Sequence, residues 1–162
     1  MNQYSVFLLL GANLGEREVT LAKATQLIAE RISPITAQSH LYQTAPWGVI
    51  DQPAFLNQVI RLETEFTPDE VLAQTLEIEK QLGRERRLRW GARVIDIDML
   101  YYEDVILETK NLHFPHPRLH QRRFTLVPLA EIAPDFVHPV LHRTNQELLS
   151  ECTDDSQVNV FE

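Results

Sequence analysis

Cysteine is almost absent from this 162-residue sequence, because Cys152 is the only one. A single cysteine excludes an intramolecular disulfide and a cysteine-rich zinc site. Long apolar runs are absent too, and none approaches the roughly 18 residues of a membrane span. The apolar stretch at residues 6–10 is too short and has no basic leader before it, so we expect no signal peptide. These absences predict a cytoplasmic protein.

Positive charge is also in short supply, since 15 Lys and Arg stand against 23 Asp and Glu, for a formal net charge of −8. This balance argues against a nucleic-acid-binding protein that relies on a broad positive potential. Five of the twelve arginines gather at residues 84–93, which is compatible with a small basic pocket.

The sequence has no internal repeat, low-complexity segment or Gly/Ser linker, and its apolar share is 44%. Length and composition therefore predict one domain with a proper core. We place this domain at residues 1–150 and expect a polar, loosely ordered tail at residues 151–162.

Hydrophobic periodicity predicts alternating strands and helices. Strands are expected at residues 4–10, 35–42, 55–66 and 94–102, with a small hairpin at 105–107 and 112–114. Helices are expected at residues 16–32, from Pro68 to Gly83, and at 124–132. Thr67 and Glu70 form a capping box at the start of the second helix.

The loops between these elements are marked by glycine and proline. Residues 44–53 are a loop, and residues 11–15 are interpreted as a tight turn, because the Gly11-x-x-x-Gly15 pattern lacks the Gly-Lys-Ser/Thr ending of a phosphate loop. The order β-α-β-β-α-β predicts an α+β ferredoxin-like sandwich with an extra C-terminal hairpin and short helices. In this fold one sheet face carries the helices, and we expect the other face to be free for a ligand.

The most informative segment is residues 89–100, where Asp96 and Asp98 stand two residues apart in an apolar run. On a strand they share one face, with Cβ atoms about 6–7 Å apart. The opposite face would carry Ile95, Ile97, Met99 and Tyr101. Carboxylates for a hard cation, beside arginines for phosphate oxygens, are the groups that Mg²⁺-dependent phosphoryl transfer requires. Taken alone, the pair could also be a solvated edge or a helix-capping pair.

Three sequence blocks in fixed order resemble the 6-hydroxymethyl-7,8-dihydropterin pyrophosphokinase family of the folate pathway. The most specific is Arg-Trp-Gly-Ala-Arg-Val-Ile-Asp-Ile-Asp-Met-Leu at residues 89–100, and the others lie at residues 42–57 and 115–124. The resemblance covers nearly the whole chain. It implies a ferredoxin-like fold and transfer of a diphosphate from ATP to the hydroxymethyl group of the dihydropterin, with AMP as the leaving group and two Mg²⁺ ions.

The resemblance makes Asp96 and Asp98 both catalytic residues and the metal ligands, and strand geometry independently allows this. Arg84 and Arg93 resemble the catalytic arginines of the family, which grip the transferred phosphates. A guanidinium suits this role because its planar fork bonds two oxygens at once.

The resemblance assigns ATP contacts to Arg86, Arg87, Trp90, His116 and Arg122. Arg86 and Arg87, with Arg89, lie on what is in the family a mobile loop that closes over ATP. This loop is one residue shorter here than in the best-known members, and a solvated basic loop is the other interpretation. Asn111 and His113 stand where some members contact the nucleotide, and we carry no role over to them.

A pterin is a flat, polar heterocycle that needs two apolar plates and an edge of hydrogen-bond partners. The residues that resemble the family's pterin site are Thr44, Pro46, Trp47, Phe55, Asn57 and Phe124. Phe55 and Phe124 are the plates, and the Asn57 amide offers a donor and an acceptor to the ring edge. Without the resemblance, both phenylalanines would be interpreted as ordinary core residues.

Two other functions are compatible with the residues alone. A two-metal phosphohydrolase or nuclease would use Asp96 and Asp98, but such sites usually recruit further acids or histidines. A non-catalytic ferredoxin-like binding module predicts that Asp96→Asn leaves ligand affinity intact. The favoured interpretation is a monomer that acts on two small molecules, ATP and the dihydropterin, and binds neither nucleic acid nor a membrane.

Overall fold

The computed structural model describes residues 3–13, 15–44, 54–83 and 95–161. Its helices are α1 (Arg17–Arg31), α2 (Pro68–Gly83), α3 (Arg123–Ile132) and α4 (Asn145–Glu151), with a 3₁₀ turn η1 (Leu119–Gln121). Its strands are β1 (Tyr4–Ala12), β2 (Ile35–Gln38), β3 (Tyr42–Thr44), β4 (Phe55–Thr64), β5 (Asp96–Tyr102), β6 (Leu107–Glu108), β7 (His113–Phe114) and β8 (Val158–Val160). Over these described ranges, no helix is both long and apolar enough to cross a membrane.

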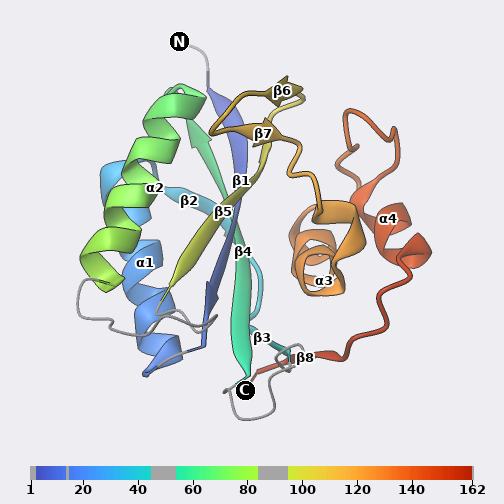
Figure 1. The fold of residues 1–162 in the computed structure, drawn as a ribbon, viewed down its shortest axis with the longest axis horizontal. Helices are drawn as coiled ribbons and strands as arrows, with labels where there is room; N and C mark the ends of the chain where they lie inside the picture. Colours follow the sequence, from blue (N-terminus) through green and yellow to red (C-terminus); the bar gives the residue numbers. More distant parts are fainter. Residues whose placement is uncertain (1–2, 14, 45–53, 84–94, 162) are drawn as a thin grey trace.

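The main sheet runs in the order β5-β1-β4-β3-β8, and β2 also pairs with β4. All of these pairings are antiparallel. Strands β6 and β7 form the expected hairpin, with Leu107 opposite Phe114. Helices α1 and α2 lie on one side of the strands, and α3 and α4 lie on the other (Figure 1).

Strand β1 is buried on both faces, and this corrects the expectation of an open sheet face. Val6, Leu8 and Leu10 belong to the core cluster under α1 and α2. Phe7 and Leu9 belong to a second cluster, which includes apolar side chains of α3 and α4. Because side chains alternate along a strand, a strand that is apolar at every position must be covered on both sides. The second helix pair therefore leaves only part of that sheet face for a ligand.

The predicted alternation along β5 is wrong at Tyr101. Leu8 of β1 pairs with Met99 and Phe7 pairs with Tyr101, so Leu100 is an extra residue on β5. This bulge moves Tyr101 to the side of α3 and α4, where its hydroxyl donates to Oδ1 of Asn145 (2.8 Å). Asp96 and Asp98 precede the bulge and keep their common face.

The strand expected at residues 35–42 ends as β2 at Gln38, and a separate strand, β3, runs from Tyr42 to Thr44, which was expected to begin a loop. At the break, the backbone N–H of Ser39 donates to the carbonyl of Val59 (2.9 Å), and the backbone N–H of Val59 donates to Oγ of Ser39 (3.0 Å). The Ser39 side chain thus takes the place of a main-chain acceptor. The backbone hydrogen-bond ladder against β4 is interrupted at this side-chain contact.

The turn expected at residues 11–15 begins later than predicted. Gly11 and Ala12 still belong to β1 and pair with Asn57 and Leu56 of β4. Gly15 has a φ of 64°, a left-handed conformation that glycine adopts without strain. The only part of the prediction that holds among the described residues is the turn around Gly15.

Within the described part of the chain, α2 and α4 each begin with a capping box, and the sequence interpretation found the one at α2. At α2 the backbone N–H of Thr67 donates to Oε1 of Glu70 (2.8 Å), and the N–H of Glu70 donates to Oγ1 of Thr67 (3.2 Å). Thr144 and Glu147 form the same box at α4. The prediction for α2 is confirmed, and α4 was missed.

The C-terminal segment differs from the loosely ordered tail that composition suggested. Residues of β8 pair with β3, with Val160 opposite Tyr42 and Val158 opposite Thr44. The backbone N–H of Phe161 donates to the carbonyl of Leu41 (2.8 Å). Polar composition indicated exposure correctly, but the unpaired edge of β3 gives this segment a partner for its backbone.

Candidate functional site

A cavity of about 610 Å³ opens on the sheet face that α3 and α4 leave uncovered. The sheet contributes Leu9 and Gly11 from β1, Thr44 from β3, Phe55 and Asn57 from β4, and Asp96 and Asp98 from β5. The opposite wall is formed by Arg118, Gln121, Arg122 and Phe124, and by Thr153, Asp154 and Asp155 of the C-terminal segment. Every described residue that was predicted to bind the pterin or the metal lies in this list.

Strand register explains why the polar side chains meet. Gly11 of β1 lies opposite Asn57 of β4 on one side and opposite Asp96 of β5 on the other. Leu9 lies opposite Asp98. Residues at matched positions of neighbouring strands point to the same face, so the amide and both carboxylates open on one cavity.

Gly11 is a site residue that the sequence interpretation treated only as part of a turn. A Cβ atom at this position would lie 2.7 Å from Oδ1 of Asn57. The Asn57 side chain therefore lies across the glycine, in space that any other residue would fill. Asn57 is only 5% exposed, so its amide has little freedom to move aside.

Thr44 has a hydroxyl group for which the described part of the chain offers no partner. Thr44 is 4% exposed, and its Oγ1 is buried without a hydrogen bond to any described residue. A buried hydroxyl without a partner is costly, and such groups commonly mark a site that a ligand or water completes. Since Thr44 lines the cavity beside Phe55, its position suits a hydrogen bond to a polar ring edge.

Asp96 and Asp98 are half-buried on β5, which pairs with β1 alone among the described strands. Between them, the backbone N–H of Ile97 points outward from the sheet edge and donates to Oε2 of Glu79 on α2 (2.7 Å). The Ile97 side chain is buried in the core. These contacts fix the backbone of β5 between the two carboxylates.

The metal-binding potential of the site rests on this pair. Among the residues that the structure describes, no group of three or more His, Cys, Asp or Glu is placed to hold a metal ion. Mg²⁺ is usually held by one or two carboxylates together with substrate phosphates and water. Two half-buried carboxylates that open on a cavity large enough for a substrate fit that ion and do not fit a closed structural zinc site.

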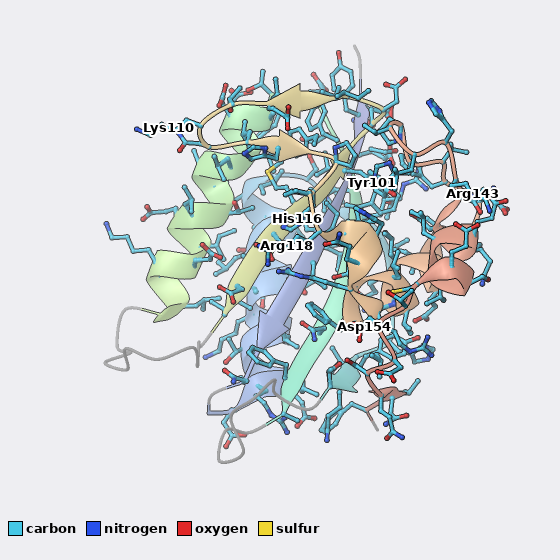
Figure 2. The ribbon with its side chains drawn as sticks, turned by 45° about the vertical axis from the view of Figure 1, so that its right-hand side comes forward. Tyr101, Lys110, His116, Arg118, Arg143 and Asp154 are labelled. Carbon is cyan, nitrogen blue, oxygen red and sulfur yellow. The ribbon has the colours of Figure 1, made fainter. Side chains whose placement is uncertain are left out.

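Cationic groups face the carboxylates from the η1–α3 wall. Arg118 and Arg122 line the cavity, and the Arg122 guanidinium lies 5.6 Å from the centre of the Phe124 ring. His116 lies next to them, and burial, together with the charges of Arg122 and Arg118, lowers its pKa to about 4. Its Nδ1 accepts from the backbone N–H of Arg118 (3.1 Å), so a neutral His116 carries its proton on Nε2. Figure 2 shows His116 and Arg118 beside β5, with Asp154 below α3.

The sequence of residues 7–134 matches the family model of 7,8-dihydro-6-hydroxymethylpterin-pyrophosphokinase, abbreviated HPPK. The chain belongs to the HPPK family. A Methylorubrum extorquens protein named 2-amino-4-hydroxy-6-hydroxymethyldihydropteridine pyrophosphokinase is 46% identical over 132 residues, which is 81% of this chain and 84% of that protein. An Aquifex aeolicus protein of the same name is 39% identical over 149 residues, 92% of each chain.

Solved structures support the fold of the HPPK chain. The crystal structure of wild-type Plasmodium falciparum HPPK-DHPS with pteroate superposes with a TM-score of 0.77 at 17% identity, over 93% of this chain. The matched part is 42% of that longer chain. At this identity the likeness shows the α+β fold alone.

Part of the predicted HPPK site lies outside the described residues. This applies to Arg84, Arg86, Arg87, Arg89, Trp90 and Arg93, and to Pro46 and Trp47. Their roles remain predictions. His116 is described but is not part of the cavity wall, and Asn111 and His113 lie exposed at the β6–β7 hairpin. Arg118 and the segment 153–155 line the cavity without having been predicted.

Proposed function

We propose that the protein is a 2-amino-4-hydroxy-6-hydroxymethyldihydropteridine diphosphokinase (EC 2.7.6.3) of folate biosynthesis. It transfers a diphosphate from ATP to the hydroxymethyl group of 6-hydroxymethyl-7,8-dihydropterin, and AMP leaves. Membership of the HPPK family supports this reaction. The observation that carries it is that Asp96 and Asp98 share one cavity with the Asn57 amide and two phenylalanine rings.

The fold fits the same proposal. The order β5-β1-β4, with β2 and β3 paired to β4 and with α1 and α2 on one face, supports a ferredoxin-like topology. In this order β4 and β5 flank β1, which places Asn57 on one side of Gly11 and the carboxylates of β5 on the other. Helices α3 and α4 and the hairpin are additions to that core.

The pterin occupies the part of the cavity near β3 and β4. Phe55 and Phe124 face it as apolar plates, and the Asn57 amide hydrogen-bonds its pyrimidine edge. The buried Thr44 hydroxyl supplies a further partner for the ring edge. This arrangement orients the hydroxymethyl group toward the carboxylates of β5.

The triphosphate of ATP occupies the part of the cavity near β5. Asp96 and Asp98 would hold Mg²⁺, with two ions expected, and the ions would supply neutralisation of phosphate charge. Arg122 binds phosphate oxygens from the opposite wall, and His116 donates from Nε2 in its neutral form. Arg84 and Arg93 grip the transferred group, and Arg86, Arg87 and Trp90 belong to the loop over ATP.

The proposed enzyme is a cytoplasmic monomer with two small-molecule substrates. A formal net charge of −8 supports a protein that does not bind nucleic acid, and the cationic residues of the cavity wall are a local exception. Electrostatic attraction for the ATP anion is then confined to the site itself.

The test is mass spectrometry of the reaction of the purified protein with ATP, Mg²⁺ and hydroxymethyl-dihydropterin. We expect pterin diphosphate and AMP in equal amounts, and neither product when the pterin or Mg²⁺ is omitted. Formation of ADP, or phosphate release without the pterin, would instead indicate a phosphohydrolase or a different kinase. Binding of both substrates without turnover would indicate a non-catalytic module.

A further inference from the structure

The C-terminal segment is part of the cavity wall. Thr153, Asp154 and Asp155 line the same cavity as Asn57 and Phe124. The family match ends at residue 134, so this wall lies in sequence outside the matched range. None of these three residues was assigned a role from the sequence.

The segment is held in place from both ends. On its N-terminal side, α4 packs against α3, and the Cys152 side chain contacts the second core cluster. On its C-terminal side, β8 pairs with β3, where Val158 lies opposite Thr44 of the cavity. The Arg17 guanidinium also lies 5.6 Å from the centre of the Phe161 ring. Residues 153–157 therefore connect α4 to β8, which is paired with β3.

Asp154 makes the contacts that join this segment to α3. Its Oδ2 accepts from the backbone N–H of Arg123 (3.0 Å), and its Oδ1 accepts from the backbone N–H (3.0 Å) and the hydroxyl (2.5 Å) of Ser156. Burial by itself would raise the pKa of Asp154. The hydrogen bonds from Ser156 and Arg123 outweigh burial and lower the pKa, so the carboxylate is ionised at neutral pH.

Helix α3 lacks a cap of its own. Its N-cap residue, Arg122, makes no side-chain capping bond, and its first turn contains no acidic residue. The first N–H groups of a helix need acceptors, and a negative charge there is favourable. Asp154, from a distant part of the chain, supplies an acceptor for the N–H of Arg123 and a negative charge near the start of the helix.

The residues on either side of Arg123 belong to the cavity wall. We propose that Asp154 is a positioning residue for substrate binding, which fixes the start of α3 and with it Arg122 and Phe124. This inference rests on the proposed function, in which Arg122 binds ATP and Phe124 stacks on the pterin. Asp154 acts through α3, by its hydrogen bond to the backbone N–H of Arg123.

The test compares full-length wild-type protein with Asp154→Ala and Asp154→Asn, using steady-state kinetics for both substrates and a thermal unfolding curve for each variant. Loss of a helix cap corresponds to roughly a 2- to 30-fold change in an equilibrium constant. We expect Asp154→Ala to raise KM for ATP and the pterin within this range, with kcat changed less than about twofold. Asp154→Asn retains one acceptor oxygen and should give an intermediate KM.

Asp135→Asn is the matched control, because Asp135 is an exposed acid just after α3 that does not line the cavity. It should leave both KM values unchanged. A wild-type KM in Asp154→Ala, or a fall in kcat at constant KM, would overturn the positioning role. Absence of pyrophosphokinase activity in the wild type would count against the proposed function instead, so the two failures are distinguishable.

Discussion

Gly11 shows how one absent side chain shapes the cavity. Its missing Cβ leaves the space that Oδ1 of Asn57 occupies, since a Cβ would lie 2.7 Å from that oxygen. Gly11→Ala should therefore displace the Asn57 amide and raise KM for the pterin by about tenfold or more, because a well-formed buried hydrogen bond is worth roughly 1–3 kcal/mol when lost. KM for ATP should change little, and steady-state kinetics with each substrate varied measures both effects.

Gly83→Ala is the control for that substitution, because a Cβ at Gly83 would meet nothing within 4 Å. It should leave pterin affinity unaltered. Asn57→Ala provides the complementary change and should weaken the pterin while sparing ATP. If Gly11→Ala bound the pterin as tightly as the wild type, the amide of Asn57 would not be part of the pterin site.

Asp96 is the residue on which catalysis is expected to depend most. Asp96→Asn keeps the size of the side chain and removes the charge that we propose to hold Mg²⁺, an ion that would stabilise developing phosphate charge by several kcal/mol. We expect kcat to fall at least about 10³-fold, while the unfolding midpoint stays near that of the wild type. Glu108→Gln, at an exposed position on β6, should keep full activity. A near-normal rate for Asp96→Asn would reject the metal role.

The residues of the site were predictable to the extent that their function depends on local sequence. Asp96 and Asp98 are two apart on a strand, so their common face follows from geometry alone. Arg118 and Asp154 line the cavity only because η1 and the C-terminal segment come to lie against the sheet. The sequence around Arg118 or Asp154 contains no pattern that would predict this tertiary contact.

At the level of elements, strongly periodic segments and capping boxes were the reliable signals. Helices α1, α2 and α3 lie within one or two residues of their predicted bounds. Helix α4 has 7 residues, too few for a periodic stripe, but its Thr144-x-x-Glu147 motif is the same signature that identified α2. The β5 bulge and the β2–β3 break could not be predicted, because each depends on how a partner strand pairs.

Helix α4 offers a test of its capping box. Oγ1 of Thr144 accepts from the backbone N–H of Glu147 (3.1 Å), and Leu148 of this helix is buried in the second core cluster. Thr144→Ala should lower the free energy of unfolding by about 1 kcal/mol, the usual cost of losing such a cap. Urea denaturation measures this loss. Ser150→Ala, at an exposed position of the same helix, should cost almost nothing, and an equal loss in both variants would contradict the capping role.

The cavity lies on the part of the sheet face that α3 and α4 leave uncovered. Helices α1 and α2 lie on one side of the sheet, and α3 and α4 lie on the other (Figure 1). The cavity is lined by Leu9 and Gly11, near the C-terminal end of β1. At that end Gly11 and the aligned residues of β4 and β5 line the cavity. The composition predicted one core of ordinary size, but the division of apolar residues between two layers depends on the bulge and on α4.

The same two-layer packing buries histidines, and this makes stability depend on pH. Burial, with smaller contributions from His120 and His142, lowers the pKa of His138 to about 4. Its Nδ1 accepts from the backbone N–H groups of Val140 (3.2 Å) and Leu141 (3.0 Å), so protonation would break both bonds. In the unfolded chain the pKa is about 6.5. The contribution of neutral His138 to the free energy of unfolding is therefore fully present above pH 6.5, and it is lost as the pH falls toward 4.

For His138 alone, this difference corresponds to a loss of about 2 kcal/mol in the free energy of unfolding between pH 7 and pH 5. His116, whose pKa is also lowered to about 4, adds a loss of the same sign. Urea denaturation at several pH values across this range measures the slope. His138→Asn keeps an acceptor for the two N–H groups and removes the titration, so its slope should be shallower. His142→Asn, at an exposed position, should keep most of the wild-type slope, because His142 makes only a smaller contribution to the lowered pKa of His138. Equal slopes in all three proteins would show that His138 is not the group that titrates.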